Sequence, residues 1–136
     1  MPSQAVFAAV MARLESNWDE TPITDPNGGG RVPARNTPYL TVEFPIANEE
    51  QLTVGSPGHN VFREEGAFRI VLSVPIGHKL TPFNAWIDEL RTVFRAQSFA
   101  GVETWGAAPA ITNTRSANGA YFELSFSVPY RFDFLA

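Results

Sequence analysis

The chain of 136 residues is short enough to form one domain and long enough to bury roughly two thirds of its unfolded surface. A hydrophobic content of 44% and a charged content of 18% exclude wholesale disorder. The net charge of −4 argues against a dedicated nucleic-acid binder, and the lack of cysteine excludes disulfides and thiolate metal sites. We find neither a secretory signal nor the roughly 20 apolar residues of a membrane span, so we expect a soluble protein made in the cytoplasm.

The sequence predicts that the chain begins with a helix over residues 3–17. Ser3 is expected to cap it. Arg13 lies off the apolar stripe and is expected to be solvated. The residues that recur at the spacing of one helical face, and that we expect in the core, are Val6, Phe7, Val10, Met11 and Leu14.

A long flexible loop is predicted over residues 19–38, with Asp25 to Gly30 at its centre. Asp25 and Asn27 are residue types that bind calcium, but the other acidic positions and the final glutamate of a calcium loop are missing. The three consecutive glycines are not followed by the Lys-Ser/Thr pair of a phosphate-binding loop. We therefore expect an exposed loop without a ligand.

Strands are predicted over about 39–44, 49–55 and 64–75. In the last of these, Phe68, Ile70, Leu72 and Val74 alternate with less apolar residues, which is the pattern of a strand that packs one face on a core. The segment between the second and third strands is rich in Gly, Pro and Asn, as reversals require. We therefore predict a projecting strand–turn–strand unit, with a boundary between fold and interaction surface near Gly66.

A second helix is predicted over 81–96, with Thr81 as its N-cap and Pro82 as its first helical residue. Strands follow over about 102–105, 110–114 and 120–134. Pro129 suggests an edge or a bend in the last strand. Because that strand exceeds the usual length, we expect its end to leave the sheet and pair elsewhere. The residues that mark the buried stripe of the second helix are Phe83, Trp86, Ile87, Leu90, Val93 and Phe94.

These elements predict an α+β fold: a single domain with a mostly antiparallel, mixed sheet, two amphipathic helices packed on one face, and a projecting hairpin.

The sequence offers little chemistry. His59 and His78 are the only near-neutral acid–base candidates, and both lie in turn-like segments without a second metal ligand at a useful spacing. Glu49 with Glu50, and Glu64 with Glu65, are better explained as a solvated rim of the hairpin than as paired catalytic carboxylates. We predict no catalytic, cofactor or metal site, although a small enzyme without a recognisable motif stays an alternative.

Four segments together resemble the phage tail terminator-like family, of the minor tail protein U type found in long non-contractile tails and in gene transfer agents. They are Ser3–Leu14, Gln51–Gly58, Phe62–Gly66 and Val128–Phe134. The resemblance extends over nearly the whole chain, and the insert Asp25–Gly30 is its least similar part. None of the four segments is a catalytic signature.

The resemblance implies a structural virion protein that forms a hexameric ring on the head-proximal end of the tail tube. Such a ring ends tube polymerisation and provides the joint to the head. The implied partners are further copies of the chain, the tail tube protein and the connector (stopper) protein of the neck, with DNA only as passing cargo. An acidic chain suits such a passage, because phosphate contacts would retard DNA. Another neck or head–tail connector protein is the alternative within the same class.

We expect the turn of the hairpin to contact a neighbouring subunit or the tube, because a monomer gains nothing from an apolar pair on an exposed turn. The alternative is that Val61 and Phe62 pack onto their own sheet. The predicted interface residues are Gly55, Ser56, Pro57, Gly58, His59, Asn60, Val61, Phe62, Arg63 and Glu64.

Overall fold

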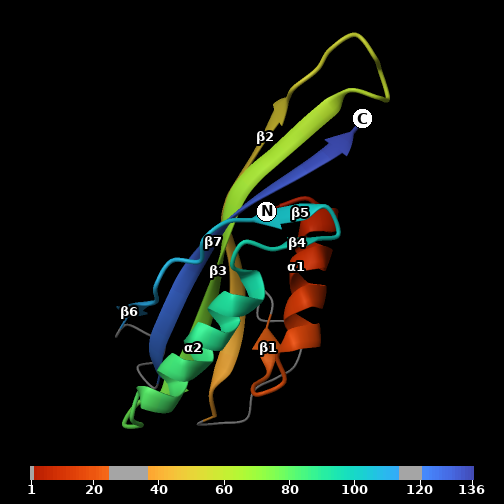
Figure 1. The fold of residues 1–136 in the computed structure, drawn as a ribbon. Helices are drawn as coiled ribbons and strands as arrows, with labels where there is room; N and C mark the ends of the chain where they lie inside the picture. The colour runs from red at the N-terminus through yellow and green to blue at the C-terminus, as the bar shows by residue number, and fades with distance from the viewer. Residues whose placement is uncertain (1, 25–36, 114–120) are drawn as a thin grey trace.

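The computed structural model of the chain describes residues 2–24, 37–113 and 121–136. These residues form two helices and a curled, mixed sheet of seven strands in the spatial order β1-β2-β3-β7-β5-β4, with β6 also paired to β7 (Figure 1). The predicted α+β class is therefore confirmed. The elements in chain order are α1 (Gln4–Asn17), β1 (Ile23–Thr24), β2 (Tyr39–Gln51), β3 (Val61–Pro75), α2 (Thr81–Phe94), β4 (Ser98–Phe99), β5 (Val102–Thr104), β6 (Ile111–Asn113) and β7 (Tyr121–Leu135).

The centre of the sheet is one long antiparallel pairing between β3 and β7. Its register runs without interruption from Val61 opposite Leu135 to Pro75 opposite Tyr121. The end of β7 therefore stays in the sheet, and the prediction that it leaves to pair elsewhere is wrong. Pro129 is not at an edge of the sheet either: it lies opposite Ala67, and on its other side its carbonyl accepts the Trp105 N–H at 3.2 Å.

The core lies between the lower half of this sheet and the two helices, which lie on the same face (Figure 1). The predicted inward face of β3 is confirmed, because Phe68, Ile70, Leu72 and Val74 are all buried. The α1 stripe is buried at Val6, Val10 and Leu14, whereas Phe7 and Met11 are half-buried at its margin. The fully buried α2 residues are Phe83, Ile87, Leu90 and Phe94, with Trp86 and Val93 half-buried beside them.

Three expectations for the helices are wrong in detail. Ser3 occupies the N-cap position of α1, but its side chain makes no capping bond. Thr81 is not the N-cap of α2, because the helix begins at Thr81 itself after Leu80. Arg13 is not simply solvated: its Nε donates to the Val93 carbonyl at 2.8 Å and its guanidinium lies 4.9 Å from the centre of the Phe99 ring, which ties α1 to the end of α2 and to β4.

Strand lengths also differ from the sequence predictions. The strand expected over 39–44 continues to Gln51, so no separate strand begins at residue 49, and residues 52–55 belong to the following loop. The second helix ends at Phe94 instead of residue 96, because Arg95 already has an extended backbone with ψ 119° and Ala96 follows with a left-handed φ of 50°. The expected loop 19–38 contains strand β1, which pairs in parallel with β2. Residues 25–36 of that loop, with the calcium and phosphate candidates, lie outside the described residues. Neither helix in the described parts is long and apolar enough to cross a membrane.

Gly66 marks the point where the sheet leaves the helices. The β2–β3 register shifts between Glu43 and Ile46, and this irregularity brings the Ile46 backbone against Gly66. A Cβ added to Gly66 would lie 2.1 Å from the Ile46 carbonyl oxygen. Only glycine therefore allows the two strands to approach this closely.

The first prediction concerns this approach. Gly66→Ala forces two paired backbones apart and should lower the free energy of unfolding by about 1–3 kcal/mol, as overpacking does. The matched control is Gly106→Ala, because no atom lies within 4 Å of a Cβ placed there. Urea denaturation compares them, and equal midpoints for the two variants would contradict the account of Gly66.

Candidate interaction surface at the hairpin tip

Beyond Gly66 the strands β2, β3 and β7 continue as a ribbon that extends past the helices (Figure 1), and β5 pairs with β7 only at the base of this ribbon, over residues 130–132. We define the ribbon as residues 46–51 of β2, 61–67 of β3 and 129–135 of β7. Each β3 residue from 62 to 67 has a partner on both sides, as Phe62 does with Gln51 and Phe134. An isolated two-stranded hairpin is marginally stable in water, so the third strand gives this projection its rigidity.

The end of the ribbon, which we call the tip, consists of residues 52–60 with Leu135 and Ala136. Gly55 and Gly58 adopt φ values of 93° and 84°, which other residues rarely adopt. The His59 N–H donates to the Ser56 carbonyl at 2.8 Å and closes the turn.

Asn60 holds the tip to the rest of the ribbon. Its backbone N–H and carbonyl pair with the carbonyl and N–H of Ala136 at 3.0 and 2.9 Å. Its side-chain Oδ1 accepts the Ser56 N–H at 3.1 Å, and the residue is buried. Asn60 therefore shapes the turn from inside, and its side chain is not exposed at the predicted interaction surface.

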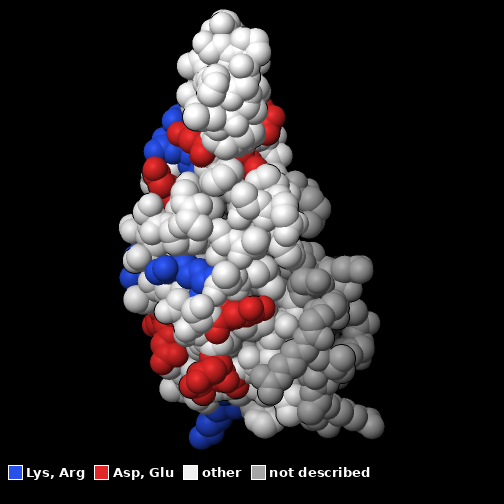
Figure 2. Space-filling view, turned by 90° about the vertical axis from the view of Figure 1, so that its right-hand side faces the viewer, with Lys and Arg blue, Asp and Glu red and all other residues white. Residues whose placement is uncertain are grey.

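The tip exposes apolar side chains and carries no Lys, Arg, Asp or Glu. Val54 is 82% exposed, Leu135 64% and Leu52 41%. On the face drawn in Figure 2 the tip is uncharged, and charged side chains begin only below it. The charged residues that follow the tip along the paired strands, which we call the charged collar, are Glu49, Glu50, Arg63, Glu65 and Asp133. Gly55, Ser56, Pro57, Gly58 and His59 are also exposed.

Phe62 and Val61 are half-buried, so they only partly contribute to the exposed surface. The Phe62 ring stacks on Phe134 with centroids 5.6 Å apart, and Phe134 in turn stacks on Phe132 at 5.9 Å. The alternative considered above, local packing on its own sheet, is thus observed for Phe62. The apolar side chains that the tip presents most fully are instead Val54 and Leu135, followed by Leu52.

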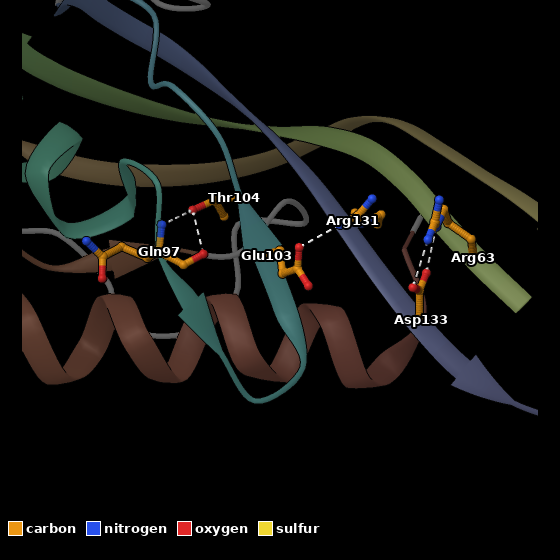
Figure 3. Close-up of polar contacts among 6 residues, drawn as sticks. All are labelled: Arg63, Gln97, Glu103, Thr104, Arg131 and Asp133. Carbon is orange, nitrogen blue, oxygen red and sulfur yellow. Dashed lines mark hydrogen bonds and ion pairs between the residues drawn. The ribbon is translucent and has the colours of Figure 1, made fainter. Parts of the chain in front are cut away.

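Ion pairs stiffen the ribbon across its strands (Figure 3). Arg63 on β3 binds both carboxylate oxygens of Asp133 on β7, at 2.8 and 3.1 Å, and this contact lowers the pKa of Asp133. Arg131 donates to Glu103 at 2.8 Å and lies 5.2 Å from the centre of the Trp105 ring. Because these ion pairs are partly exposed, we expect them to orient the strands but to add little to the free energy of unfolding.

Glu64 is buried, although the sequence predicted it at the interface and on a solvated rim. Its carboxylate accepts the Tyr130 hydroxyl at 2.7 Å and the Ser3 backbone N–H at 3.2 Å. A buried carboxylate needs such partners, and the first turn of α1 is a favourable place for a negative charge. Glu64 therefore fastens the start of α1 to the base of the ribbon. The signal was present in the sequence, because Glu64 shares the parity of Phe62, Phe68 and Ile70.

The described residues contain no arrangement that suggests catalysis or metal binding. His59 and His78 are both exposed, and no group of three or more His, Asp or Glu side chains within the described parts is placed to hold a metal ion. Glu65, unlike Glu64, is exposed. The arrangement at this end of the molecule is suited to contact with another macromolecule.

The second prediction concerns the Glu64–Tyr130 pair. Glu64→Ala leaves the buried Tyr130 hydroxyl without its acceptor and should cost about 1–3 kcal/mol of unfolding free energy. Glu64→Gln keeps an acceptor oxygen and should cost less. In a double-mutant cycle, Tyr130→Phe should offset part of the Glu64→Ala loss. The matched control is Glu65→Ala, an exposed neighbour that should stay within about 0.5 kcal/mol of the parent. Equal losses for Glu64→Ala and Glu65→Ala would contradict the buried pair.

The third prediction follows from the titration of Tyr130. Burial, and then the hydrogen bond to Glu64, raise the pKa of this phenol well above its ordinary value. Above about pH 10 the unfolded chain loses the Tyr130 proton while the folded chain keeps it, so the free energy of unfolding falls as pH rises. Tyr130→Phe should show a shallower alkaline decline in urea denaturation than the parent. The same slope in both proteins would show that Tyr130 titrates normally.

Comparisons with known proteins bear on what this surface does. The family model of the phage tail terminator protein matches residues 5–130. No curated protein matches the chain significantly. A solved structure whose description states no function superposes with a TM-score of 0.64 at 20% identity, covering 98% of both chains. That likeness concerns the fold alone. The family match spans both helices, the hairpin and most of β7, and the chain therefore belongs to the phage tail terminator family, whose role is structural and in the tail of the virion.

Proposed function

We propose that this protein assembles as a hexameric ring on the head-proximal end of the tail tube. There it ends tube polymerisation and provides the joint to the head. The proposal rests on membership of the phage tail terminator family, and the hexamer comes from the resemblance described above. The proposed partners are other copies of the chain, the tail tube protein and the connector (stopper) protein of the neck. Assembly in the host cytoplasm, in a phage or a gene transfer agent, is part of the same proposal.

The observation that carries the proposal is the exposed apolar tip on a rigid ribbon. A side chain such as Val54, which is 82% exposed, gains free energy when a partner removes it from water. The third ribbon strand and the Asn60 bonds hold the tip in one shape before it binds, which lowers the entropic cost of association. The contact surface we propose therefore consists of Leu52, Val54, Gly55, Ser56, Pro57, Gly58 and His59, with Val61, Phe62 and Arg63 at its margin.

A capping ring also has to let DNA pass. The net charge of −4 is compatible with that passage, because a surface without excess cations does not retain phosphates. We propose no enzymatic activity. The other structural candidate, a neck or head–tail connector protein, is favoured by no specific contact and differs in its position along the particle.

The fourth prediction tests the tip. Val54→Asp places a charge on the proposed contact and should yield tails that are overlong or not joined to heads, because a buried unpaired charge disfavours the contact. The control is Ile111→Asp on β6, which is 65% exposed and lies far from the tip, toward the opposite end of the molecule (Figure 1).

Electron microscopy of tails from particles that carry each variant measures tail length and head attachment. Both variants should keep the parental melting temperature, since both sites are exposed. Tails of normal length on infectious heads with Val54→Asp would refute the role of the tip. A deletion of residues 56–61 is a poorer test, because it removes the buried Asn60.

A further inference from the structure

The helix-free face of the sheet carries a shallow apolar hollow at the base of the ribbon, with a volume of about 370 Å³. Four of its lining residues lie in one row across the sheet, because Ile46 pairs with Ala67, Ala67 pairs with Pro129, and the Trp105 N–H binds the Pro129 carbonyl. The small residues Ala67 and Pro129 form its floor. Ile46 and Trp105, which are 52% and 45% exposed, form its walls. We call this feature the trough.

The trough is built by the same irregularity that requires glycine at position 66. Residues of the opposite parity, such as Phe68 and Val128, point to the helices and are buried. Ala67 and Pro129 therefore face away from the core. On the side toward the tip, the next row is polar and consists of Asn48, Glu65 and Arg131. Arg131 is engaged by Glu103 and by the Trp105 ring, whereas Glu65 makes no ion pair within the described residues.

We propose that the trough is the receptor for the tip of a neighbouring copy of this chain. Its walls stand three strand spacings apart, about 14 Å, and the three-stranded end of the ribbon spans two such spacings, about 10 Å. The tip and the trough are both apolar at their centres. At their edges a polar contact is available, because the exposed His59 imidazole of the tip can donate a hydrogen bond to the Glu65 carboxylate on the rim.

The occupant has to come from another molecule. From Ile46 to Leu52 the chain runs away from the trough in a paired strand, which carries its own tip about 20 Å from it. A contact between two different surfaces of one chain is heterologous, and such a contact generates a closed ring when the rotation between copies closes. This inference rests on the proposed ring. It adds the second surface that a ring needs and assigns the tip to the neighbouring subunit instead of the tube.

The test uses the absence of cysteine from the chain. Val54→Cys on the tip and Ile46→Cys on the trough wall are prepared as single variants, with distinguishable tags, and as a double variant. Tails that carry them, and the isolated chain, are treated with a short bismaleimide. A mixture of the two single variants should give cross-linked dimers that contain both tags, and the double variant should give a ladder of larger species. Ile111→Cys replaces Ile46→Cys in the matched control, which should give no adduct with Val54→Cys.

A second variant tests the shape of the trough. Ala67→Phe, made in the Val54→Cys and Ile46→Cys backgrounds, fills the floor and should reduce the yield of mixed dimers about tenfold or more. The melting temperature of the Ala67→Phe variant shows separately whether the variant is folded.

The proposal is overturned if tails contain no Val54–Ile46 adduct, if Val54→Cys cross-links mainly to itself, or if it cross-links only to another tail protein. Tail length in the same preparations separates the two hypotheses. If the cysteine variants give tails of normal length without the adduct, and Val54→Asp still gives overlong tails, the capping function stands and the trough contact is refuted.

Discussion

The pairing of β3 with β7 is the constraint on which the rest of the structure depends. One unbroken register, from Val61 opposite Leu135 to Pro75 opposite Tyr121, serves two different environments. In its lower half the inward residues, such as Ile70 and Phe126, are covered by the helices and form the core. In its upper half only the start of α1 reaches the same strands, at Glu64. Alternation there places the Phe62–Phe134 stack on one face and the ion pair of Arg63 with Asp133 on the other. The projection is thus a direct extension of the core ladder, and its position is fixed by the core.

Two contacts lie at the point where the β3–β7 pairing leaves the helix-covered core and enters the ribbon. Gly66 allows the Ile46 backbone to approach where the β2 register shifts, and that shift creates the trough on the helix-free face. On the other face, Glu64 accepts hydrogen bonds from the Tyr130 hydroxyl and from the Ser3 backbone N–H at the start of α1, which closes the end of the core with a buried polar contact. Because hydrogen bonds are directional, the contact of Glu64 with Ser3 fixes the position of α1 along β3, which an apolar side chain would not do.

The sequence predicted those features that depend on local periodicity. The alternation of Phe68 to Val74 and the stripe of α2 identified the core, because burial of one face dictates a repeat of two or of about four residues. Features that depend on partners far apart in the chain were missed. Whether Glu64 is solvated or buried depends on Tyr130 and Ser3, which are 66 and 61 residues away. The fate of Asn60 depends on Ala136, and the trough forms only when four separate segments meet. β1 and β4, with two residues each, are too short to produce a periodic signal.

Membership of the phage tail terminator family assigns a structural role in the tail. The proposed tip and trough are the two surfaces that one chain would contribute to it. The central claim is that the ribbon and its tip, on one side of Gly66, serve assembly, whereas the parts of the same strands that the helices cover serve the fold. The most direct test is a cryo-electron microscopy reconstruction of the head-proximal end of tails that contain this protein. The account predicts a ring on the last tube layer in which each tip, residues 52–59, is buried against protein. A ring whose tips all project into solvent, or a chain located elsewhere in the particle, would contradict it.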